Sequence, residues 1–248
     1  MIIRITNRCR MGCSHCLIHE SGPEGAHMER GTFRKALYLA ADIGAQIILI
    51  SGGEPFEHPD LEDMVTSVPI MGKLLGVEFR VLIASNGMFL EDEAKYKMAL
   101  SLKVPIQITR DPEFYPLPLS DLARQRVDAA EMMVVEEVIS GNITPCDRVR
   151  DNGIEVSRVS PMCFNFRSAV RAKGIHTGMA LLQQAGKFCC PAVNVDGTLV
   201  AGEADTCAPI GDVNSGALEI ERAIKKLVCR RCHLTDNLDE LHLQAIEG

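Results

Sequence analysis

Short apolar runs alternate with longer amphipathic segments over the first two thirds of the chain. Short runs rich in Ile, Leu and Val, without helical spacing, are typical of buried strands. Such runs predict six strands, at 1–6, 47–50, 78–84, 104–109, 132–138 and 154–159. Because strands that alternate with helices form parallel sheets with helical crossovers, we expect an α/β fold.

Apolar residues between these runs recur at helical spacing. We expect a helix capped by Thr32 and stopped at Gly44, since a hydroxyl satisfies free amides at a helix start and glycine readily ends a helix. A second helix opens at Asp60 and is interrupted at Pro69, because proline removes a helical hydrogen bond. Further helices are predicted at 91–102, 120–129 and 145–153.

The pattern changes after about residue 175. The alternating segment 189–200 turns at Asp196-Gly197, a dipeptide that favours a tight hairpin, and a helix follows at about 216–226. The chain is long enough for one barrel-type domain and a small appendix. We therefore expect two domains, at 1–175 and 176–248.

Composition excludes several classes of protein. Hydrophobic residues make up 46% and charged residues 24% of the 248 residues, which is ordinary for a globular protein. A net charge of −7 argues against nucleic-acid binding through a broad basic surface. No apolar run approaches the length of a membrane span, and the strand at 1–6 leaves no room for a signal peptide. A cytoplasmic protein with no membrane or nucleic-acid partner is expected.

Ten cysteines without an export signal favour metal or redox chemistry over disulfides. Three of them, Cys9, Cys13 and Cys16, follow the first strand with the spacing C-x3-C-x2-C. Thiolates this close can converge on zinc or on an iron–sulfur cluster. A zinc site would take His15 or His19 as its fourth ligand, whereas a four-iron cluster would keep one iron open to a substrate or cofactor.

A second motif, Gly52-Gly53-Glu54-Pro55, follows the predicted strand at 47–50. Two glycines after a strand permit backbone geometry that lets a ligand approach the main chain. The cysteine spacing followed by this motif resembles the radical S-adenosylmethionine (SAM) enzymes. The resemblance implies a catalytic [4Fe-4S] cluster that binds SAM and is held by Cys9, Cys13 and Cys16. It also implies a set of SAM contacts at His15, Gly52, Gly53, Glu54 and Pro55.

The same resemblance extends to two further strand ends and one later stretch. Ser85-Asn86-Gly87 and Thr109-Arg110-Asp111 follow predicted strands and look like the family's contacts to the ribose and carboxylate of SAM. Arg171 lies in a stretch that faintly resembles the Gly-Arg-Ala sequence of many members. These likenesses add SAM contacts at Ser85, Asn86, Thr109 and Arg171. The six predicted strands match the family's partial (β/α)6 TIM-like barrel.

A second set of cysteines lies in about the last sixty residues. Cys189 and Cys190 precede the hairpin, Cys207 follows it, and Cys229 and Cys232 form a C-x2-C pair. Four thiolates suit a zinc site and an iron–sulfur cluster equally well. The arrangement resembles the twitch domain, a shortened SPASM domain, which implies a small C-terminal domain of β-hairpin and helix with one auxiliary [4Fe-4S] cluster. Whether Cys189 or Cys190 is the ligand stays open.

The resemblance also implies a function. Members cleave SAM reductively to a 5′-deoxyadenosyl radical, which abstracts a hydrogen atom from a substrate carbon, and an auxiliary cluster can accept the substrate's electron. We expect a radical SAM oxidoreductase or maturase that modifies a ribosomal peptide. The alternative is a dehydrogenase that oxidises a small-molecule alcohol of the aminocyclitol type. The implied partners are a low-potential donor of the flavodoxin or ferredoxin type and, for a peptide substrate, a separate leader-peptide-binding protein.

A third hypothesis is a zinc-binding structural or regulatory protein, against which Gly52-Gly53-Glu54-Pro55 speaks. Cys146 and Cys163 belong to neither cysteine set. Free cysteines are usually buried small hydrophobes, although either thiol could donate a hydrogen atom to a substrate radical.

Overall fold

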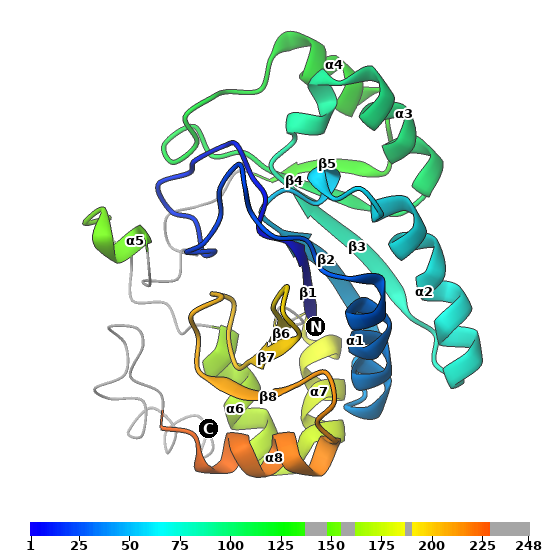
Figure 1. Ribbon diagram of the computed structural model, residues 1–248, viewed down its shortest axis with the longest axis vertical. Helices are drawn as coiled ribbons and strands as arrows, with labels where there is room; N and C mark the ends of the chain where they lie inside the picture. Colours follow the sequence, from blue (N-terminus) through cyan, green and yellow to red (C-terminus); the bar gives the residue numbers. More distant parts are fainter. Residues whose placement is uncertain (137–147, 155–161, 187–189, 229–248) are drawn as a thin grey trace.

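The computed structural model describes residues 1–136, 148–154, 162–186 and 190–228 (Figure 1). Its centre is one eight-stranded sheet. The strands are β1 (Ile2–Thr6), β2 (Ile47–Gly52), β3 (Arg80–Ser85), β4 (Ile106–Thr109), β5 (Met133–Glu136), β6 (Ala192–Val193), β7 (Thr198–Val200) and β8 (Pro209–Asp212). Their order across the sheet is β5-β4-β3-β2-β1-β6-β7-β8. The sheet is not closed, and β5 and β8 are its outer strands among the residues described.

Two kinds of strand pairing build this sheet. β1 to β5 run parallel, each beside the next, as expected for strands joined by helices. β6 pairs with β1 in parallel, with Ile2 opposite Ala192, so the C-terminal strands extend the same sheet beyond β1. β7 and β8 then add to β6 in antiparallel fashion. The hairpin predicted at 189–200 is therefore confirmed as β6 and β7.

Helices occupy the crossovers and the C-terminal part of the chain. Those between the parallel strands are α1 (Arg30–Asp42), α2 (Leu61–Leu75), α3 (Glu93–Leu102) and α4 (Asp121–Asp128), with short 3-10 turns η1 (Pro55–Glu57) and η2 (Met88–Glu91). Those that follow β5 are α5 (Arg148–Asp151), α6 (Met162–Lys173), α7 (Ile175–Gln184) and α8 (Ala217–Lys226). Within the described ranges, no helix is long and apolar enough to cross a membrane.

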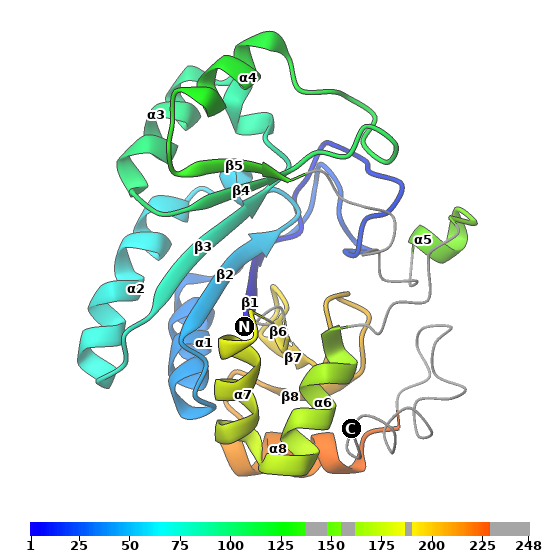
Figure 2. The ribbon, with the colours of Figure 1, turned by 180° about the vertical axis from the view of Figure 1, so that it is seen from behind.

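The sheet is curved and apolar on both faces. Figures 1 and 2 show α1, α2 and α3 on its convex side. The larger hydrophobic cluster lies between the sheet and the helices and takes Ile3 and Ile5 from β1. Ile2 packs on the concave side, in a smaller cluster with Leu49, Ala192 and Val200. Since successive side chains of a strand face opposite sides, Arg4 shares the concave face with Ile2.

Two predicted helix boundaries are wrong. α2 continues through Pro69, because that residue is exposed while Val65, Val68 and Met71 on either side pack into the core. α1 begins two residues before the predicted cap Thr32, and Glu29 stands at its N-cap without a side-chain hydrogen bond.

The predicted end of α1 is confirmed. Gly44 follows the end of α1 with a φ of 79°, as expected of a helix stop. α6 and α7 lie within 162–184, where the sequence predicts no element. The sixth predicted strand, 154–159, lies almost wholly outside the described residues.

The end of β2 packs directly on the chain that leaves β1. The Gly53 amide donates to the Thr6 carbonyl oxygen at 2.6 Å, and the Glu54 amide donates to that of Arg8 at 2.8 Å. A Cβ atom added to Gly52, whose φ is 144°, would stand 2.2 Å from the Thr6 carbonyl oxygen. One added to Gly53 would stand 2.4 Å from that of Arg8. The glycines therefore serve close approach to protein backbone here.

This packing predicts that Gly53→Ala destabilises the fold. The added methyl group would meet backbone that cannot swing aside, and overpacking of this kind lowers the free energy of unfolding by on the order of 2 kcal/mol. Gly31→Ala is the matched control, because no atom of the described residues lies within 4 Å of a Cβ at that position in α1. Alanine's helix preference should leave it neutral or up to about 1 kcal/mol more stable. Anaerobic denaturant unfolding measures both, and equal changes would contradict the packing argument.

Candidate active site

The three N-terminal cysteines lie on the loop between β1 and α1, at the carboxyl end of β1 (Figure 1). Hydrogen bonds between its two limbs close this loop. The Cys9 amide donates to the Gly22 carbonyl oxygen at 2.8 Å, and the Asn7 amide donates to that of Ala26 at 2.8 Å. The Thr6 hydroxyl donates to the same Ala26 oxygen at 3.0 Å. The loop thus has a defined backbone that continues the strand.

The thiols of Cys9, Cys13 and Cys16 are partly buried and close enough to affect one another. Burial raises the pKa of Cys13 to about 12, and the neighbouring Cys16 and Cys9 add to the shift. Burial also raises the pKa of Cys9. Ionisation of the Cys9 and Cys13 thiols therefore needs a compensating positive charge, which a metal centre supplies.

The donor set fits a cluster better than a single ion. Among the residues described, no three His, Cys, Asp or Glu side chains converge closely enough to hold one metal ion. A four-iron cube separates its thiolate ligands further than a single ion does. The Met11 amide points at the Cys9 sulfur at 3.5 Å, and Ser21 Oγ lies 3.3 Å from the Cys16 sulfur. Hydrogen bonds to ligand sulfur tune iron–sulfur clusters, so Cys9, Cys13 and Cys16 are the residues that would hold one.

Glu54 is the most deeply buried carboxyl group at the site, with 1% of its surface exposed. Its oxygens accept hydrogen bonds from the Ser85 hydroxyl at 2.9 and 3.0 Å and from the Asn86 amide at 2.9 Å. The Phe56 amide donates a further bond at 3.1 Å. Burial raises the pKa of Glu54 to about 7, against the lowering effect of these donors. The side chain thus joins the ends of β2 and β3, and does not point at open space.

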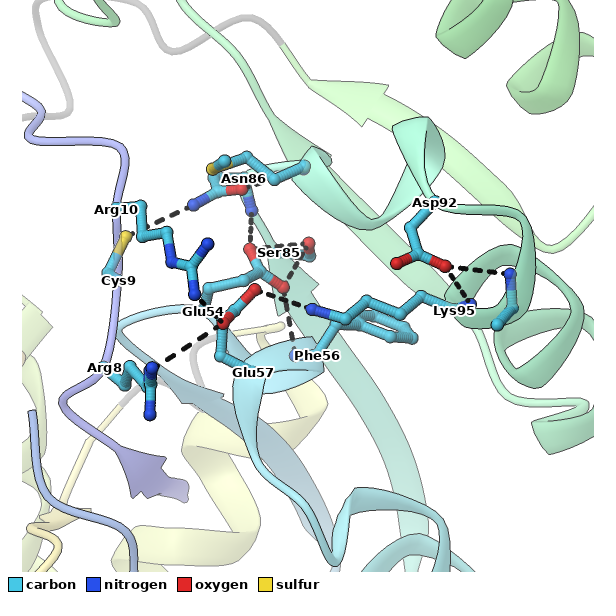
Figure 3. Close-up of polar contacts among 12 residues, drawn as sticks. Arg8, Cys9, Arg10, Glu54, Phe56, Glu57, Ser85, Asn86, Asp92 and Lys95 are labelled. Atoms are coloured by element: carbon cyan, nitrogen blue, oxygen red, sulfur yellow. Dashed lines mark hydrogen bonds and ion pairs between the residues drawn. The ribbon is translucent and has the colours of Figure 1, made fainter. Parts of the chain in front are cut away.

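The link continues from Asn86 to the cysteine loop (Figure 3). Asn86 Nδ2 donates to the Cys9 sulfur at 3.4 Å, while its Oδ1 accepts from the Met88 amide at 2.9 Å. Close by, Glu57 pairs with Lys95 at 2.6 Å and lies 3.9 Å from Arg8 and 4.0 Å from Arg10. The two arginines that flank Cys9 therefore share one carboxylate.

An aromatic group covers the far side of the loop. The His15 ring lies 5.2 Å from that of Phe114 and 5.0 Å from that of Tyr115, and its buried Nδ1 has no hydrogen-bond partner among the described residues. Burial lowers the pKa of His15, so the ring is held neutral. The Tyr115 hydroxyl donates to Thr109 Oγ1 at 3.0 Å, and Thr109 in turn lies 3.4 Å from the Ser85 carbonyl oxygen.

The structure thus gathers most predicted site residues at one edge of the sheet. Gly52 and Gly53 contact the backbone of 6–8, and Pro55 begins η1. Arg171 lies elsewhere: it donates to the carbonyl oxygens of Ile224 at 3.3 Å and Leu227 at 2.7 Å, at the end of α8. Its expected contact with SAM stays a prediction, and the geometry assigns it to helix packing.

The second cysteine set is described only in part. Cys207 is half-buried against the concave cluster, and Cys190 is buried with 2% exposed. Cys189, Cys229 and Cys232 lie outside the described residues, as does Cys146. Cys163 falls in α6, where its side chain is not described. The ligand choice between Cys189 and Cys190 therefore stays open.

Several contributing residues were missed in the sequence. Phe114 and Tyr115 lie in the proline-rich stretch 111–118, which predicts a loop that either closes over substrate or acts as a spacer, and no motif marks Glu57. Arg110, which places its guanidinium 5.6 Å from the Tyr115 ring centroid, carried no signal beyond its place at a strand end. Arg4 did carry one, since a charged residue stands out within the apolar run at 1–6.

Comparison with known proteins places this geometry in context. The sequence model described as the Radical SAM superfamily matches residues 3–160. A probable GTP 3′,8-cyclase of Methanosarcina mazei is 28% identical over 148 residues, which are 56% of this chain and 39% of that protein. A probable GTP 3′,8-cyclase of Methanothermobacter marburgensis is 32% identical over 93 residues, 36% of this chain and 28% of that protein. The chain thus spans well under half of these relatives.

Solved structures share the fold across nearly the whole chain. BtrN in complex with AdoMet and 2-DOIA covers 100% of this chain and 86% of its own, with a TM-score of 0.56 and 15% identity. Native anSMEcpe with bound AdoMet and Cp18Cys peptide covers 91% of this chain and 79% of its own, with a TM-score of 0.54 and 12% identity. The α/β fold with an open, mostly parallel sheet is therefore the partial barrel of these structures.

The buried Glu54 predicts a pH dependence of stability. Its folded-state pKa of about 7 lies above the ordinary 4.5, so its contribution is fully present below pH 4.5 and is lost as pH rises through 7. The shift corresponds to about 3 kcal/mol. Relative to Glu54→Gln, which cannot ionise, the wild type should lose about that much stability between pH 4.5 and 8. Anaerobic urea unfolding across this range measures it.

The exposed Glu62→Gln variant is the control, and its stability should follow the wild type at every pH. A constant difference between wild type and Glu54→Gln across the range would show that the Glu54 carboxyl does not titrate as its burial requires.

Proposed function

Because the chain belongs to the Radical SAM superfamily, we propose that it cleaves SAM reductively and abstracts a hydrogen atom from a substrate carbon. The observation that carries this proposal is the presence of the partly buried thiols of Cys9, Cys13 and Cys16 on one loop at the carboxyl end of β1, with Asn86 donating to the Cys9 sulfur. The carboxyl ends of barrel strands are where catalytic groups collect.

Different residues of the chain have different roles at this site. A [4Fe-4S] cluster with SAM, when bound, supplies a 5′-deoxyadenosyl radical. Cys9, Cys13 and Cys16 would hold three of its irons, which would leave the fourth open to SAM. Asn86 and the Met11 amide orient the Cys9 sulfur. Phe114 and Tyr115 exclude water from the side of the loop that carries His15, and they hold the ring in place.

Other SAM contacts follow from the same geometry. Ser85 and Asn86 end β3 beside the cysteine loop, and Thr109 ends β4 next to them. We propose that these polar groups meet the ribose and carboxylate of SAM. The Glu54 carboxylate is already bonded to Ser85 and Asn86, so its contribution is to fix their positions. The main chain of Gly52 to Pro55 is then the part of this motif that would meet the amino group of SAM.

The second cysteine set supplies an electron acceptor in this proposal. An auxiliary [4Fe-4S] cluster, if held by these cysteines, would take one electron from a substrate that has lost one hydrogen atom, and the accompanying proton would pass to solvent. A flavodoxin- or ferredoxin-type donor supplies the single electron that SAM cleavage needs. The net change is a two-electron oxidation of the substrate. Of the second cysteine set, the structure describes Cys207, which packs beside the concave face, and Cys190, which is buried.

Two substrate classes receive support. We propose peptide modification first, supported by the fold that the chain shares with anSMEcpe, whose structure holds a peptide. A separate leader-peptide-binding protein would then present the substrate. Oxidation of a small molecule is the second candidate. It is supported by the whole-chain fold match to BtrN with 2-DOIA and by sequence relatives whose names specify GTP.

The cluster assignment predicts a sharp loss of activity. Changing Cys9, Cys13 and Cys16 together to alanine should abolish 5′-deoxyadenosine formation from SAM under strong reductant, because the cluster whose open iron would bind SAM is lost. Anaerobically reconstituted wild type should hold roughly eight irons and the variant roughly four. Chromatography of the nucleoside and an iron assay measure the two. A triple variant that still cleaves SAM near the wild-type rate would refute the assignment.

Isotope transfer separates the substrate classes. Extract of the source organism grown in deuterated medium is divided by size into peptides and small molecules, and each fraction is incubated with enzyme, reductant and unlabelled SAM. 5′-Deoxyadenosine with a single deuterium atom should appear only with the fraction that contains the substrate, since deuterated SAM in the extract would give a multiply labelled product, and we expect this fraction to be the peptides. Transfer confined to small molecules would favour the second candidate, and the triple alanine variant provides the blank.

A further inference from the structure

Arg110 is a buried cation that contacts the cysteine loop. It directly follows β4, and 7% of its surface is exposed. Its Nη1 donates to the Leu117 carbonyl oxygen at 2.6 Å and lies 3.6 Å from the Met11 sulfur. The guanidinium also lies 5.6 Å from the centre of the Tyr115 ring. Met11 stands two residues before Cys13, so the guanidinium touches the segment that carries this thiol.

Further contacts hold the same two parts of the chain together. The Ser14 amide donates to the Phe114 carbonyl oxygen at 3.2 Å. One residue on, the His15 ring lies against the rings of Phe114 and Tyr115. The segment 110–117 therefore packs along the cysteine loop, and several independent contacts place Arg110 beside that loop.

The charge of Arg110 is not balanced by the described groups of the chain. Its Nε is buried and has no hydrogen-bond partner among the residues described. In that same part of the chain, no carboxylate forms an ion pair with Arg110. The carboxylate of the adjacent Asp111 accepts instead from the Glu113 amide at 2.8 Å. Burying a cation without an anion is strongly unfavourable, so Arg110 needs a negative partner.

Arg126 shows the same contacts with the charge balanced. Its guanidinium lies 4.7 Å from the centre of the Tyr96 ring, and its Nη1 donates to the Leu90 carbonyl oxygen at 2.6 Å. These contacts match those that Arg110 makes with a tyrosine ring and a carbonyl oxygen. Arg126 differs in that it also pairs with the carboxylate of Glu93. An arginine in this kind of place thus takes an anion as its third partner.

The acidic groups near Arg110 include one thiol of the cysteine loop. Burial lowers the pKa of Arg110, and the groups that oppose this effect are Tyr115, Cys13, Glu54 and Glu91, in that order. Burial raises the pKa of Cys13, and Arg110 acts on that thiol in the opposite direction. Of the four groups, Cys13 is the one that belongs to the loop that Arg110 contacts. Negative charge at the Cys13 sulfur therefore stabilises the guanidinium, and the reverse holds too.

We propose that Arg110 is the counter-cation of the iron–sulfur cluster that Cys9, Cys13 and Cys16 would hold, and that it raises the midpoint potential of this cluster. This inference rests on the proposed function and adds a residue that is not a ligand of the cluster. Three thiolates outweigh the positive charge of the four-iron core they hold, so the cluster is negative overall and becomes more negative on reduction. A fixed positive charge beside it stabilises the reduced state.

The consequence for function concerns the first electron transfer. SAM cleavage begins with one electron from the flavodoxin- or ferredoxin-type donor, and a higher midpoint of the cluster makes this transfer more favourable. Arginine suits the position because its guanidinium stays charged when buried. The Leu117 carbonyl oxygen and the Tyr115 ring hold the guanidinium in place.

The test measures the midpoint potential of the first cluster in the full chain without SAM. The parent protein carries Cys207, Cys229 and Cys232 changed to alanine, so that one cluster gives the signal. An anaerobic redox titration followed by electron paramagnetic resonance compares the parent with Arg110→Gln and Arg110→Lys. We expect a lower midpoint for Arg110→Gln and a value near the parent for Arg110→Lys. Arg126→Gln is the matched control and should leave the midpoint unchanged, because that guanidinium contacts α3 and η2.

A second neutral variant and a second measurement cover the case in which Arg110→Gln does not fold. Arg110→Met also removes the charge, and an apolar side chain is tolerated well where a charge was buried. It should lower the midpoint in the same way. In addition, the parent is prepared with nitrogen-15 in its arginine side chains. Electron–nuclear double resonance of the reduced cluster should then show nitrogen couplings that Arg110→Lys removes.

The outcomes are separable. A parent that assembles no iron cluster, or that holds zinc there, overturns the proposed function and this inference with it. A parent with the cluster, whose midpoint is the same in the neutral variants, overturns the role of Arg110 alone. Because SAM is absent, the same result is expected if Arg110 serves only the carboxylate of SAM. A midpoint that falls as far in Arg126→Gln as in Arg110→Gln also overturns it. Where neither neutral variant assembles the cluster, nitrogen couplings that are unchanged in Arg110→Lys do so.

Discussion

One buried carboxyl group holds the site together. Glu54 follows the end of β2 and accepts hydrogen bonds from Ser85 and Asn86 at the end of β3. Asn86 reaches in turn to the Cys9 sulfur on the loop after β1. Three strand ends are thus fixed relative to one another by the buried side chains of Glu54, Ser85 and Asn86. A cluster site needs that order, because its ligands must be placed before the metal centre arrives.

The C-terminal strands depend on the same strand, β1. β6 extends the sheet from it, and Arg4 bonds to Asn194 and Glu203 from the middle of it. Asp205 then binds the amides of His19 and Glu20, immediately after the first cysteine set. The chain that carries Cys207 is therefore attached to the first cysteine loop at one end and to the sheet at the other. Cys207 and the first cysteine set are therefore held by the same strand and loop.

Features that follow from a repeated pattern or from a local motif can be predicted from the sequence. Strand positions, the alternation with helices and the clustering of Cys9, Ser85 and Thr109 at one edge all follow from local pattern and parallel topology. Features that depend on tertiary packing cannot be predicted in this way. α2 passes through Pro69 because the buried face of the helix continues beyond the proline. The destination of the Glu54 side chain and the contact of Gly53 with the Arg8 carbonyl are properties of assembled strands. No spacing in the chain encodes them.

The central claim is that Cys9, Cys13 and Cys16 present a cluster with one iron open to SAM. Electron paramagnetic resonance of the reduced protein, with Cys207, Cys229 and Cys232 changed to alanine to leave one cluster, tests it most directly. The account predicts that adding SAM changes the spectrum of that cluster, because SAM becomes a ligand of the open iron. A spectrum that stays the same with saturating SAM, in protein with a full complement of iron, would contradict it.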